Sequence, residues 1–335
     1  MTIRGTRRES TRTRRARSVA LGVLLASTAL VGACTSGTVA YSGTTTGGAS
    51  SSTSSTSSPG TGTGTGSSTS TGATSAAAGV DKLLVVVVEN HSLAQMRAAM
   101  PYTYGLALRY GYASHYTAIR HPSLPNYVAI ASGSTHGIAD DAPPSAHPVP
   151  GPSVFGAALA KGRTAAVYVE GMTSPCEHTS SGDYAVKHNP WPYFTAEAAQ
   201  CARHNLPLSA FDADVRSGHL PNAGMLLPDL CNDAHNCPLA TADAWFAERM
   251  KLIEAGPDWR AGRLAVVLTA DEDDHSAGNQ VLTVVAHPSL DHVVVTTPLT
   301  HYSLTRLYAE VTGTTPLGSG ATAPSMAKAF GLRLR

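Results

Sequence analysis

The chain has 335 residues, of which 24 are basic and 23 acidic, giving a net charge of +1 with histidine neutral. This balance excludes the strongly basic proteins that bind nucleic acid through charge, and we expect no nucleic-acid partner. With 42% hydrophobic residues, the chain is long and apolar enough for a large domain with a substantial core.

Residues 1–34 predict an export signal. Seven arginines within residues 2–17 precede an apolar run, Val19–Val31, which is short for a transmembrane helix. Thr13-Arg14-Arg15 leaves twin-arginine and ordinary export equally open. Val31-Gly32-Ala33-Cys34 resembles a bacterial lipobox, in which acyl chains on the cysteine anchor the protein to a membrane. The alternative is plain cleavage, which leaves a soluble protein with a free Cys34.

Residues 35–79 predict a disordered linker. They are almost entirely Ser, Thr, Gly and Ala, and such a stretch cannot bury enough surface to offset its ordering entropy. A flexible coil of this length reaches ~35–40 Å on average. We therefore expect an exported domain, residues 80–335, that is tethered to the outer face of the cell membrane or secreted.

Apolar runs alternate with helical patterns in this domain. Strands are predicted over residues 83–88, 165–169, 224–227, 264–268 and 281–286. Helices are predicted over residues 93–109, 125–132, 154–161, 208–216, 241–254, 301–312 and 325–330, with Thr241 as an N-cap. The alternation predicts a three-layer α/β/α sandwich with a mostly parallel sheet. Residues 171–207 are predicted to form an irregular insertion near the site.

Four cysteines fall in the domain, namely Cys176, Cys201, Cys231 and Cys237. An even number in an exported chain predicts disulfides. Three pairings are possible, and local spacing favours Cys176–Cys201 and Cys231–Cys237. A zinc site is the weaker alternative, because no CxxC or HxxxH spacing accompanies these cysteines.

Acidic residues follow two of the predicted strands. Glu89 and Asn90 follow the first strand, and the run Asp271–Asp274 follows the strand over 264–268. In open α/β sheets the active site lies beyond the carboxyl ends of the strands, so these groups should meet at one edge. Such oxygen ligands suit a hard divalent cation. The alternative for Asp271–Asp274 is a solvated acidic loop.

The segment His121-Pro-Ser-Leu-Pro-Asn-Tyr127 places Ser123 just ahead of a predicted helix. A helix N-terminus offers free N–H groups and a positive dipole end, which suit a bound phosphate. A serine there, beside a metal, can act as a nucleophile. Spacing alone favours the simpler interpretation that Ser123 is an N-cap.

Seven segments in order resemble the secreted acid phosphatases of the phosphoesterase family, which includes phosphatidylinositol-phosphate phosphatases and bacterial phospholipases C. They span about residues 82–332 and are Val86–Ser92, His121–Tyr127, Tyr184–Trp191, Leu227–His235, Asp243–Trp245, Asp271–Asp274 and His301–Leu304. The resemblance implies an alkaline phosphatase-like fold and the activity of a phosphoric ester hydrolase. Its partners would be phosphorylated small molecules or phospholipid head groups.

The resemblance also implies how substrate is handled. Ser123 matches the superfamily's nucleophile, which attacks phosphorus from a metal-bound alkoxide and forms a phosphoserine. Asn126 matches an asparagine that binds phosphoryl oxygens. Lys187 and His188 match a basic pair expected on the substrate phosphate.

The remaining matched residues surround an expected divalent metal ion of unknown identity and number. Its implied ligands are Glu89, Asn90, Asp271 and Glu272. His235 and His301 match histidines that line the site, where they bind a second metal or protonate the leaving group; His235 is the candidate general acid.

One residue departs from the resemblance. His275 stands where many relatives have glycine, and it is either an extra metal ligand or a surface change.

An exported acid phosphatase acting on monoesters is the leading hypothesis. A phospholipase C-type phosphodiesterase uses the same nucleophile and metal, and a non-catalytic surface lipoprotein is the alternative outside enzymes.

Overall fold

A central strand, β1 (Lys82–Val88), organises the fold, and every residue of it is buried. The structure is a computed structural model that describes residues 79–335. The predicted signal, Cys34 and the linker up to residue 78 lie outside the described residues. Within residues 79–335 no helix is long and apolar enough to cross a membrane.

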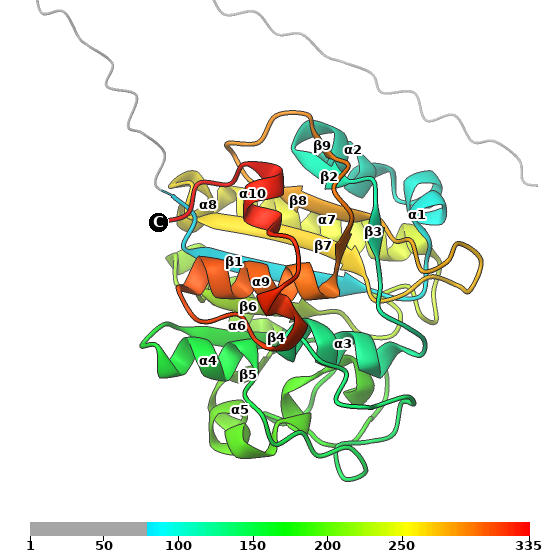
Figure 1. The fold of residues 1–335 in the computed structure, drawn as a ribbon, viewed down its shortest axis with the longest axis vertical. Helices are drawn as coiled ribbons and strands as arrows, with labels where there is room; N and C mark the ends of the chain where they lie inside the picture. Colours follow the sequence, from blue (N-terminus) through cyan, green and yellow to red (C-terminus); the bar gives the residue numbers. More distant parts are fainter. Residues whose placement is uncertain (1–78) are drawn as a thin grey trace, which may run out of the picture. The chain divides into compact units, whose positions relative to one another are not determined.

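One eight-stranded sheet runs through the domain in the order β5-β4-β6-β1-β7-β8-β2-β9 (Figure 1). Beside β1 its strands are β2 (Gly111–Ala113), β4 (Ala165–Val169), β5 (Asn205–Pro207), β6 (Ala223–Leu227), β7 (Leu264–Ala270), β8 (Thr283–Ala286) and β9 (Val293–Val295). Only β8 pairs antiparallel with its neighbours, and the other pairs are parallel. A separate pair joins β3 (Tyr116–Thr117) to β10 (Leu299–Thr300). The predicted mostly parallel sheet is confirmed.

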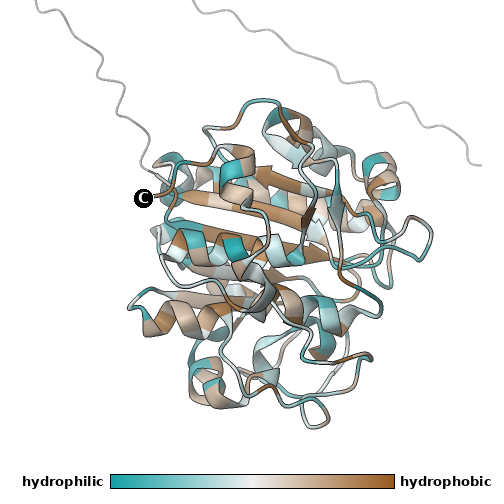
Figure 2. Ribbon diagram, in the orientation of Figure 1, coloured by the Kyte–Doolittle hydropathy of each residue, from teal (hydrophilic) through white to brown (hydrophobic). Residues whose placement is uncertain are grey.

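Helices cover both faces of this sheet, which confirms the three-layer sandwich (Figure 1). One layer holds α3 (Ser123–Ser132), α4 (Val154–Ala160), α9 (His301–Thr312) and α10 (Met326–Phe330). The other holds α1 (Leu93–Ala99), α2 (Pro101–Arg109), α6 (Leu208–Ser217), α7 (Leu239–Ala255) and α8 (Pro257–Arg260). In Figure 2 the strands are largely brown, and the helices mix brown with teal, as amphipathic helices on an apolar sheet do.

The register between β1 and β7 positions the site. The two strands run parallel from the pair Lys82–Leu264 to the pair Val88–Ala270. They therefore end side by side, and the residues that follow them, Glu89 and Asp271, begin at the same level. The main-chain N–H of Asp271 donates to the carbonyl of Val88, which extends the pairing by one residue.

Three predicted helices differ from the structure by more than one residue. The predicted helix 93–109 is divided into α1 and α2 at Pro101, because proline cannot continue the hydrogen-bonding ladder. Helix α3 begins at Ser123 instead of Pro125. Helix α7 begins at Leu239, so Thr241 lies inside it and the predicted N-cap is wrong.

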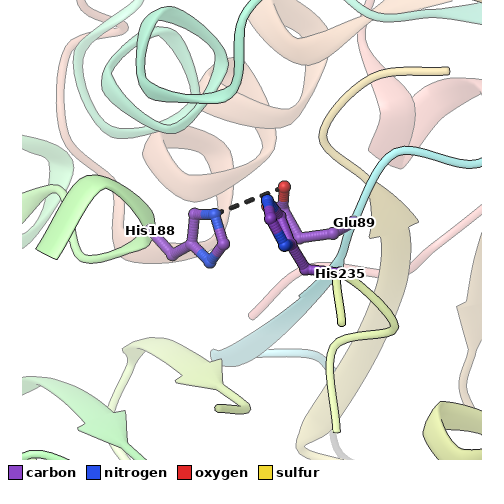
Figure 3. Close-up of side chains that lie close together, drawn as sticks. All are labelled: Glu89, His188 and His235. Atoms are coloured by element: carbon purple, nitrogen blue, oxygen red, sulfur yellow. Dashed lines mark ion pairs between the residues drawn. The ribbon is translucent and has the colours of Figure 1, made fainter. Parts of the chain in front are cut away.

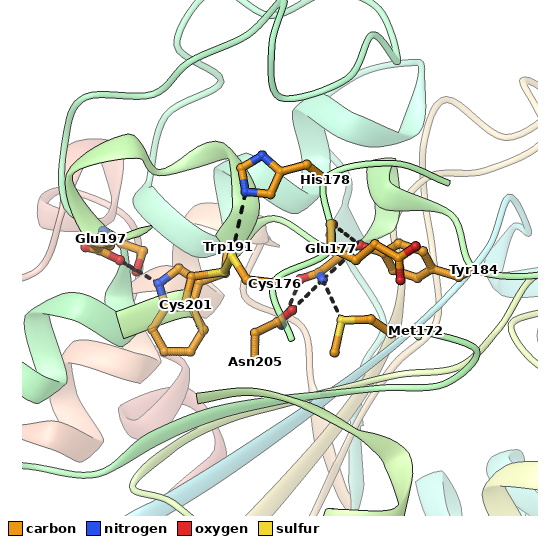
Figure 4. Close-up of a disulfide and its surroundings, with 11 residues drawn as sticks. Met172, Cys176, Glu177, His178, Tyr184, Trp191, Glu197, Cys201 and Asn205 are labelled. Atoms are coloured by element: carbon orange, nitrogen blue, oxygen red, sulfur yellow. Dashed lines mark hydrogen bonds between the residues drawn. A yellow bond between two sulfur atoms is a disulfide. The ribbon is translucent and has the colours of Figure 1, made fainter. Parts of the chain in front are cut away.

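The insertion over 171–207 contains short 3-10 turns, α5 (Ala198–His204) and β5. A disulfide joins Cys176 to Cys201 there, and a second joins Cys231 to Cys237, the pairing that spacing favours. Since all four cysteines are paired, they do not form a thiolate zinc site. Figure 4 shows the first disulfide beside buried Trp191, and because both of its cysteines belong to the insertion, it ties α5 to the start of the insertion.

Asp243 of α7 connects helix α2 to the rest of the domain. Its carboxylate accepts hydrogen bonds from the N–H groups of Tyr102 (2.9 Å) and Thr103 (2.8 Å), and from the Thr103 hydroxyl (2.7 Å). These donors belong to the first turn of α2, whose N-terminal N–H groups have no partner inside the helix.

We predict that Asp243→Ala destabilises the protein by about 2–4 kcal/mol, because it leaves buried donors of α2 unpaired. Equilibrium unfolding in urea measures this change. Asp291→Ala is the matched control, since the Asp291 side chain is 88% exposed and should change stability little. Equal stability of the two variants would contradict the capping role of Asp243.

Candidate active site

Two pairs of residues with oxygen-bearing side chains, Glu89–Asn90 and Asp271–Glu272, meet where β1 and β7 end. The main-chain N–H of Asn90 donates to Asp271 Oδ1 at 3.2 Å, and Asn90 Nδ2 lies 3.4 Å from Glu272 Oε1. Asn90 adopts a left-handed conformation (φ 41°), which asparagine tolerates better than most residues. Glu89, Asp271 and Glu272 are all buried. The four residues that the sequence predicts as metal ligands thus lie together.

Ser123 faces this cluster from the first turn of α3. Its hydroxyl donates to Glu89 Oε2 at 2.9 Å, and the Tyr127 hydroxyl, one helical turn on, donates to Glu89 Oε1 at 2.5 Å. Pro122 occupies the N-cap position, and the Ser123 hydroxyl makes no capping bond. The interpretation of Ser123 as a simple N-cap is therefore wrong.

His188 lies between two carboxylates. Its Nδ1 is 3.0 Å from Asp233 Oδ2 and its Nε2 is 3.3 Å from Glu89 Oε2. Burial alone would lower the pKa of His188, but the charge of Glu89 and the hydrogen bond to Asp233 raise it to about 9. Burial likewise favours neutral Glu89, yet His188 and the Tyr127 hydroxyl lower its pKa to about 2. Glu89 is therefore an ionised acceptor beside Ser123.

The other two carboxyl groups of the cluster, those of Asp271 and Glu272, have raised pKa values. Burial, followed by the charges of Glu89 and Glu272, raises the pKa of Asp271 well above its ordinary value. Burial and the charge of Glu89 raise the pKa of Glu272 to about 8. Three carboxyl groups share one buried site, so each opposes the ionisation of the others. A bound cation would relieve this repulsion.

The donor atoms fit a hard divalent cation. Among the described residues, Asp271 Oδ2 and Asn90 Oδ1 are buried and have no hydrogen-bond partner. They are carboxylate and amide oxygens, which such cations prefer. Glu89, His188 and His235 form a second group, whose ligand atoms lie within 4.8 Å of one another (Figure 3). Glu89 belongs to both groups and could serve either position.

Lys187 stands at the rim of the cluster. Its Nζ lies 3.2 Å from Asp141 Oδ2 and 3.4 Å from His235 Nε2. Burial alone would lower the pKa of Lys187, but the charges of Glu89 and Asp141 raise it, so the ammonium form is retained. His235 is exposed and also bonds to Asn236. Both groups are thus accessible to a substrate that approaches from solvent.

Asn126 and His301 are placed differently from the other expected site residues. Asn126 Oδ1 accepts from the N–H groups of Ile119 (3.0 Å) and Arg120 (3.2 Å), and its Nδ2 lies 3.3 Å from Glu272 Oε2. Its amide thus fixes the loop before Ser123, and a contact with phosphoryl oxygens stays a prediction. His301 is fully buried, and its Nε2 lies 2.6 Å from the main-chain oxygen of Asp271.

Burial lowers the pKa of His301 to about 4, which keeps the imidazole neutral near pH 7. Its Nδ1 lies 3.0 Å from the Tyr116 hydroxyl. In this arrangement the buried His301 side chain orients the main chain of Asp271 through its contact with the main-chain oxygen. Of the two histidines predicted to line the site, His235 therefore has the exposure that a general acid needs.

The acidic loop divides into two parts with different roles. Asp271 and Glu272 belong to the cluster, whereas Asp273 accepts from the N–H groups of His275, Ala277 and Asn279 and shapes the loop. The alternative of a solvated loop holds for exposed Asp274. His275 is exposed and stacks on His121 with ring centroids 3.7 Å apart, so it supports His121.

Sequence reasoning missed four residues at the site. Tyr127 and Asp233 lie inside segments that carried the resemblance, so a signal was available. His121 lies in one of these segments too, and its Nδ1 is 2.9 Å from Glu272 Oε2. Asp141 had no local signal, because it belongs to the irregular stretch after α3.

Ser123, the acidic cluster and the basic rim lie together at one edge of the sheet, as expected of a phosphoric ester hydrolase with an alkaline phosphatase-like fold. Residues 91–307 match the phosphoesterase family, and the chain belongs to that family. A solved structure from Vibrio parahaemolyticus, described as a protein in the alkaline phosphatase superfamily, has the same fold at 11% identity. It covers 73% of this chain and 71% of its own, with a TM-score of 0.52.

Three curated relatives point the same way. A phosphatidylinositol-3-phosphatase from Mycobacterium tuberculosis is 28% identical over 77% of this chain and 86% of its own. A probable acid phosphatase from Kluyveromyces lactis is 28% identical over 51% of this chain and 43% of its own. A phosphate-repressible acid phosphatase from Penicillium chrysogenum is 29% identical over 57% and 49%. This chain thus spans less than half the length of the two fungal relatives.

We predict that Tyr127→Phe lowers kcat for phosphate-ester hydrolysis about tenfold with little change in KM. The lost hydroxyl leaves Glu89 Oε1 without its donor, and Glu89 in turn accepts from Ser123. Steady-state kinetics measure this change. Tyr308→Phe is the control, because Tyr308 is buried and its hydroxyl donates to Gly224 O, outside the cluster. An equal loss of kcat in both variants would contradict the assignment.

Proposed function

We propose that this protein is an exported, metal-dependent acid phosphatase that hydrolyses phosphomonoesters through a phosphoserine at Ser123. The observation that carries the proposal is the hydrogen bond from the Ser123 hydroxyl to ionised Glu89 at 2.9 Å, at the N-terminus of α3. A serine with an adjacent base, placed at a helix N-terminus, is equipped to attack an anionic ester.

The proposed reaction has two displacements. Ser123 Oγ bonds to phosphorus while its proton passes to Glu89, and the ester P–O bond breaks as His235 protonates the leaving oxygen. Water then attacks phosphorus and gives a proton to His235, the bond from phosphorus to Ser123 Oγ breaks, Glu89 returns its proton to that oxygen, and inorganic phosphate leaves. Lys187 would hold the phosphoryl oxygens throughout.

A divalent cation at the cluster would lower the pKa of the serine hydroxyl and offset charge on the phosphoryl oxygens. The residues proposed to hold it are Glu89, Asn90, Asp271 and Glu272. The unpartnered buried oxygens of Asn90 and Asp271 support this assignment.

Small organic phosphates and phosphoinositide head groups are the proposed substrates. The names of the curated relatives, a phosphatidylinositol-3-phosphatase and acid phosphatases, support a monoester. A phospholipase C-type diesterase would need room for a second ester group, which the insertion over 171–207 would control.

The proposed location is the outer face of the cell membrane, with a lipid on Cys34. The arginine-rich start, the apolar run and the lipobox-like segment of the sequence support it. Metabolic labelling with a fatty acid should mark the protein and should be lost in Cys34→Ala. Labelling that persists in this variant would contradict lipidation at Cys34.

We predict metal-dependent release of p-nitrophenol from p-nitrophenyl phosphate, abolished by chelator and lowered at least ~1000-fold in Ser123→Ala. The assay runs over pH 4–9 with added divalent cations. Ser132→Ala is the matched control, because Ser132 ends the same helix with its hydroxyl bonded to Val128 O, and it should keep wild-type turnover.

Activity that survives Ser123→Ala would mean that the nucleophile is wrong. Cleavage of phosphatidylcholine without cleavage of monoesters would favour the diesterase. The absence of turnover on both, with every cation, would favour a non-catalytic lipoprotein.

A further inference from the structure

A cavity of about 390 Å³ opens beside the proposed phosphate position. This volume lies in the range of small-molecule sites. The insertion contributes most of its wall, including Thr179, Ser180 and Ser181, and Leu230 closes it from the loop after β6. Its inner wall carries two charged groups, Asp141 and Lys187.

The inner wall is directly connected to the proposed nucleophile. Asp141 Oδ1 accepts from the N–H of Leu124, the residue after Ser123, at 3.0 Å. The other oxygen of Asp141 pairs with Lys187 at 3.2 Å. Asp141 therefore lies between the anion-binding groups of the site and the cavity.

The outer wall is held in shape by the insertion's own contacts. The Tyr184 hydroxyl donates to the carbonyl of Glu177 at 2.7 Å, and Figure 4 shows this pair beside Cys176 of the disulfide. The Val186 N–H donates to Ser180 Oγ at 3.0 Å, which fixes that hydroxyl at the wall. The hollow is thus a formed feature of the fold.

Charge decides what such a hollow accepts. When Lys187 turns to a substrate phosphoryl group, Asp141 loses the cation that neutralises it. A partly buried carboxylate then favours a hydroxyl donor as its new partner and repels a second anion. The hydroxyl groups of Thr179, Ser180 and Ser181 line the facing wall and add neutral hydrogen-bonding groups.

We propose that this cavity is the leaving-group subsite of the phosphatase and that Asp141 is its specificity-determining residue. Among the proposed substrates, it selects monoesters whose leaving group is neutral and bears hydroxyls over phosphoinositides and other esters whose leaving group carries a further negative charge. The inference rests on the proposed function, because it takes Ser123 and Lys187 as the groups that engage phosphorus.

A second hollow, of about 520 Å³, lies beyond His235 and is the competing place for the leaving group. Its wall is mostly apolar and includes Ala99 and Leu239, with His91, Gln95, His235 and Asn236 as polar groups. Neither Lys187 nor Asp141 borders it. It therefore has no carboxylate that would repel an anionic leaving group, and the two hollows predict different specificity.

The test compares phenyl phosphate with 4-carboxyphenyl phosphate, which differ by one carboxylate away from the ester. We expect wild-type kcat/KM to favour phenyl phosphate at least tenfold, and Asp141→Asn to reduce this preference to about twofold. Asparagine keeps the acceptor for Leu124 N–H and removes only the charge. Asp140→Asn is the matched control, because Asp140 faces His147 and should leave the preference unchanged.

Filling the cavity with a larger side chain tests whether the leaving group binds there. Thr179→Trp should raise the KM for phenyl phosphate at least fivefold and leave inhibition by inorganic phosphate unchanged, since phosphate alone does not enter the cavity. An unchanged preference in Asp141→Asn, or an increase in KM from Ala99→Trp instead of Thr179→Trp, would overturn the proposal.

Binding separates this proposal from the proposed function. Calorimetry with Ser123→Ala should show tighter binding of phenyl phosphate than of its carboxylated analogue, and Asp141→Asn in that background should remove the difference. Intact selective binding without turnover in the wild type would overturn only the catalytic mechanism. Equal binding of the two compounds would overturn the subsite.

Discussion

The parallel pairing of β1 with β7 is the constraint on which the site depends. Its register ends both strands at one level, so Glu89 and Asp271 leave the sheet side by side and Glu272 follows. All three are buried, and like charges at such distances oppose one another strongly. The surrounding residues respond to this concentration of acid. His188, Lys187 and the Tyr127 hydroxyl stabilise Glu89 as an anion, while Asp271 and Glu272 are left short of positive charge.

Because positive charge surrounds Glu89 but not Asp271 and Glu272, the two parts of the cluster differ in their chemistry. On one side Glu89, ionised and hydrogen-bonded, accepts from the Ser123 hydroxyl. On the other, Asp271 and Asn90 keep buried oxygens that have no hydrogen-bond partner within residues 79–335, and a cation is proposed to bind there. The N-terminus of α3 and Lys187 would supply the positive charge that a phosphoryl group needs. The proposed nucleophile, the proposed metal position and the proposed phosphate-binding groups thus lie at the same edge of the sheet, and the insertion builds the wall beyond them.

Much of this arrangement could be predicted from sequence, because the strands that matter are continuous apolar runs and their ends are acidic. Glu89 and Asp271 were predicted to meet on that ground alone. Ser123 needed the family resemblance, since spacing favoured an N-cap. Contacts between residues that are far apart in the chain could not be predicted from the sequence. Thr241 was expected to cap α7, but the helix begins at Leu239, and Asp243 caps α2 instead, 140 residues away in the chain. Asp141 likewise acquires its role only through contacts with Leu124 and Lys187.

Thermal unfolding with and without a divalent cation tests the central claim most directly, with wild type beside the double variant Asp271→Asn, Glu272→Gln. In chelator the variant should have the higher Tm, because repulsion within the cluster is removed. With Mg²⁺, Mn²⁺, Zn²⁺ or Ca²⁺ added, the wild-type Tm should rise by several degrees with at least one cation, and the variant's should not. A wild-type Tm that responds to none of them, or an equal rise in both proteins, would contradict the account.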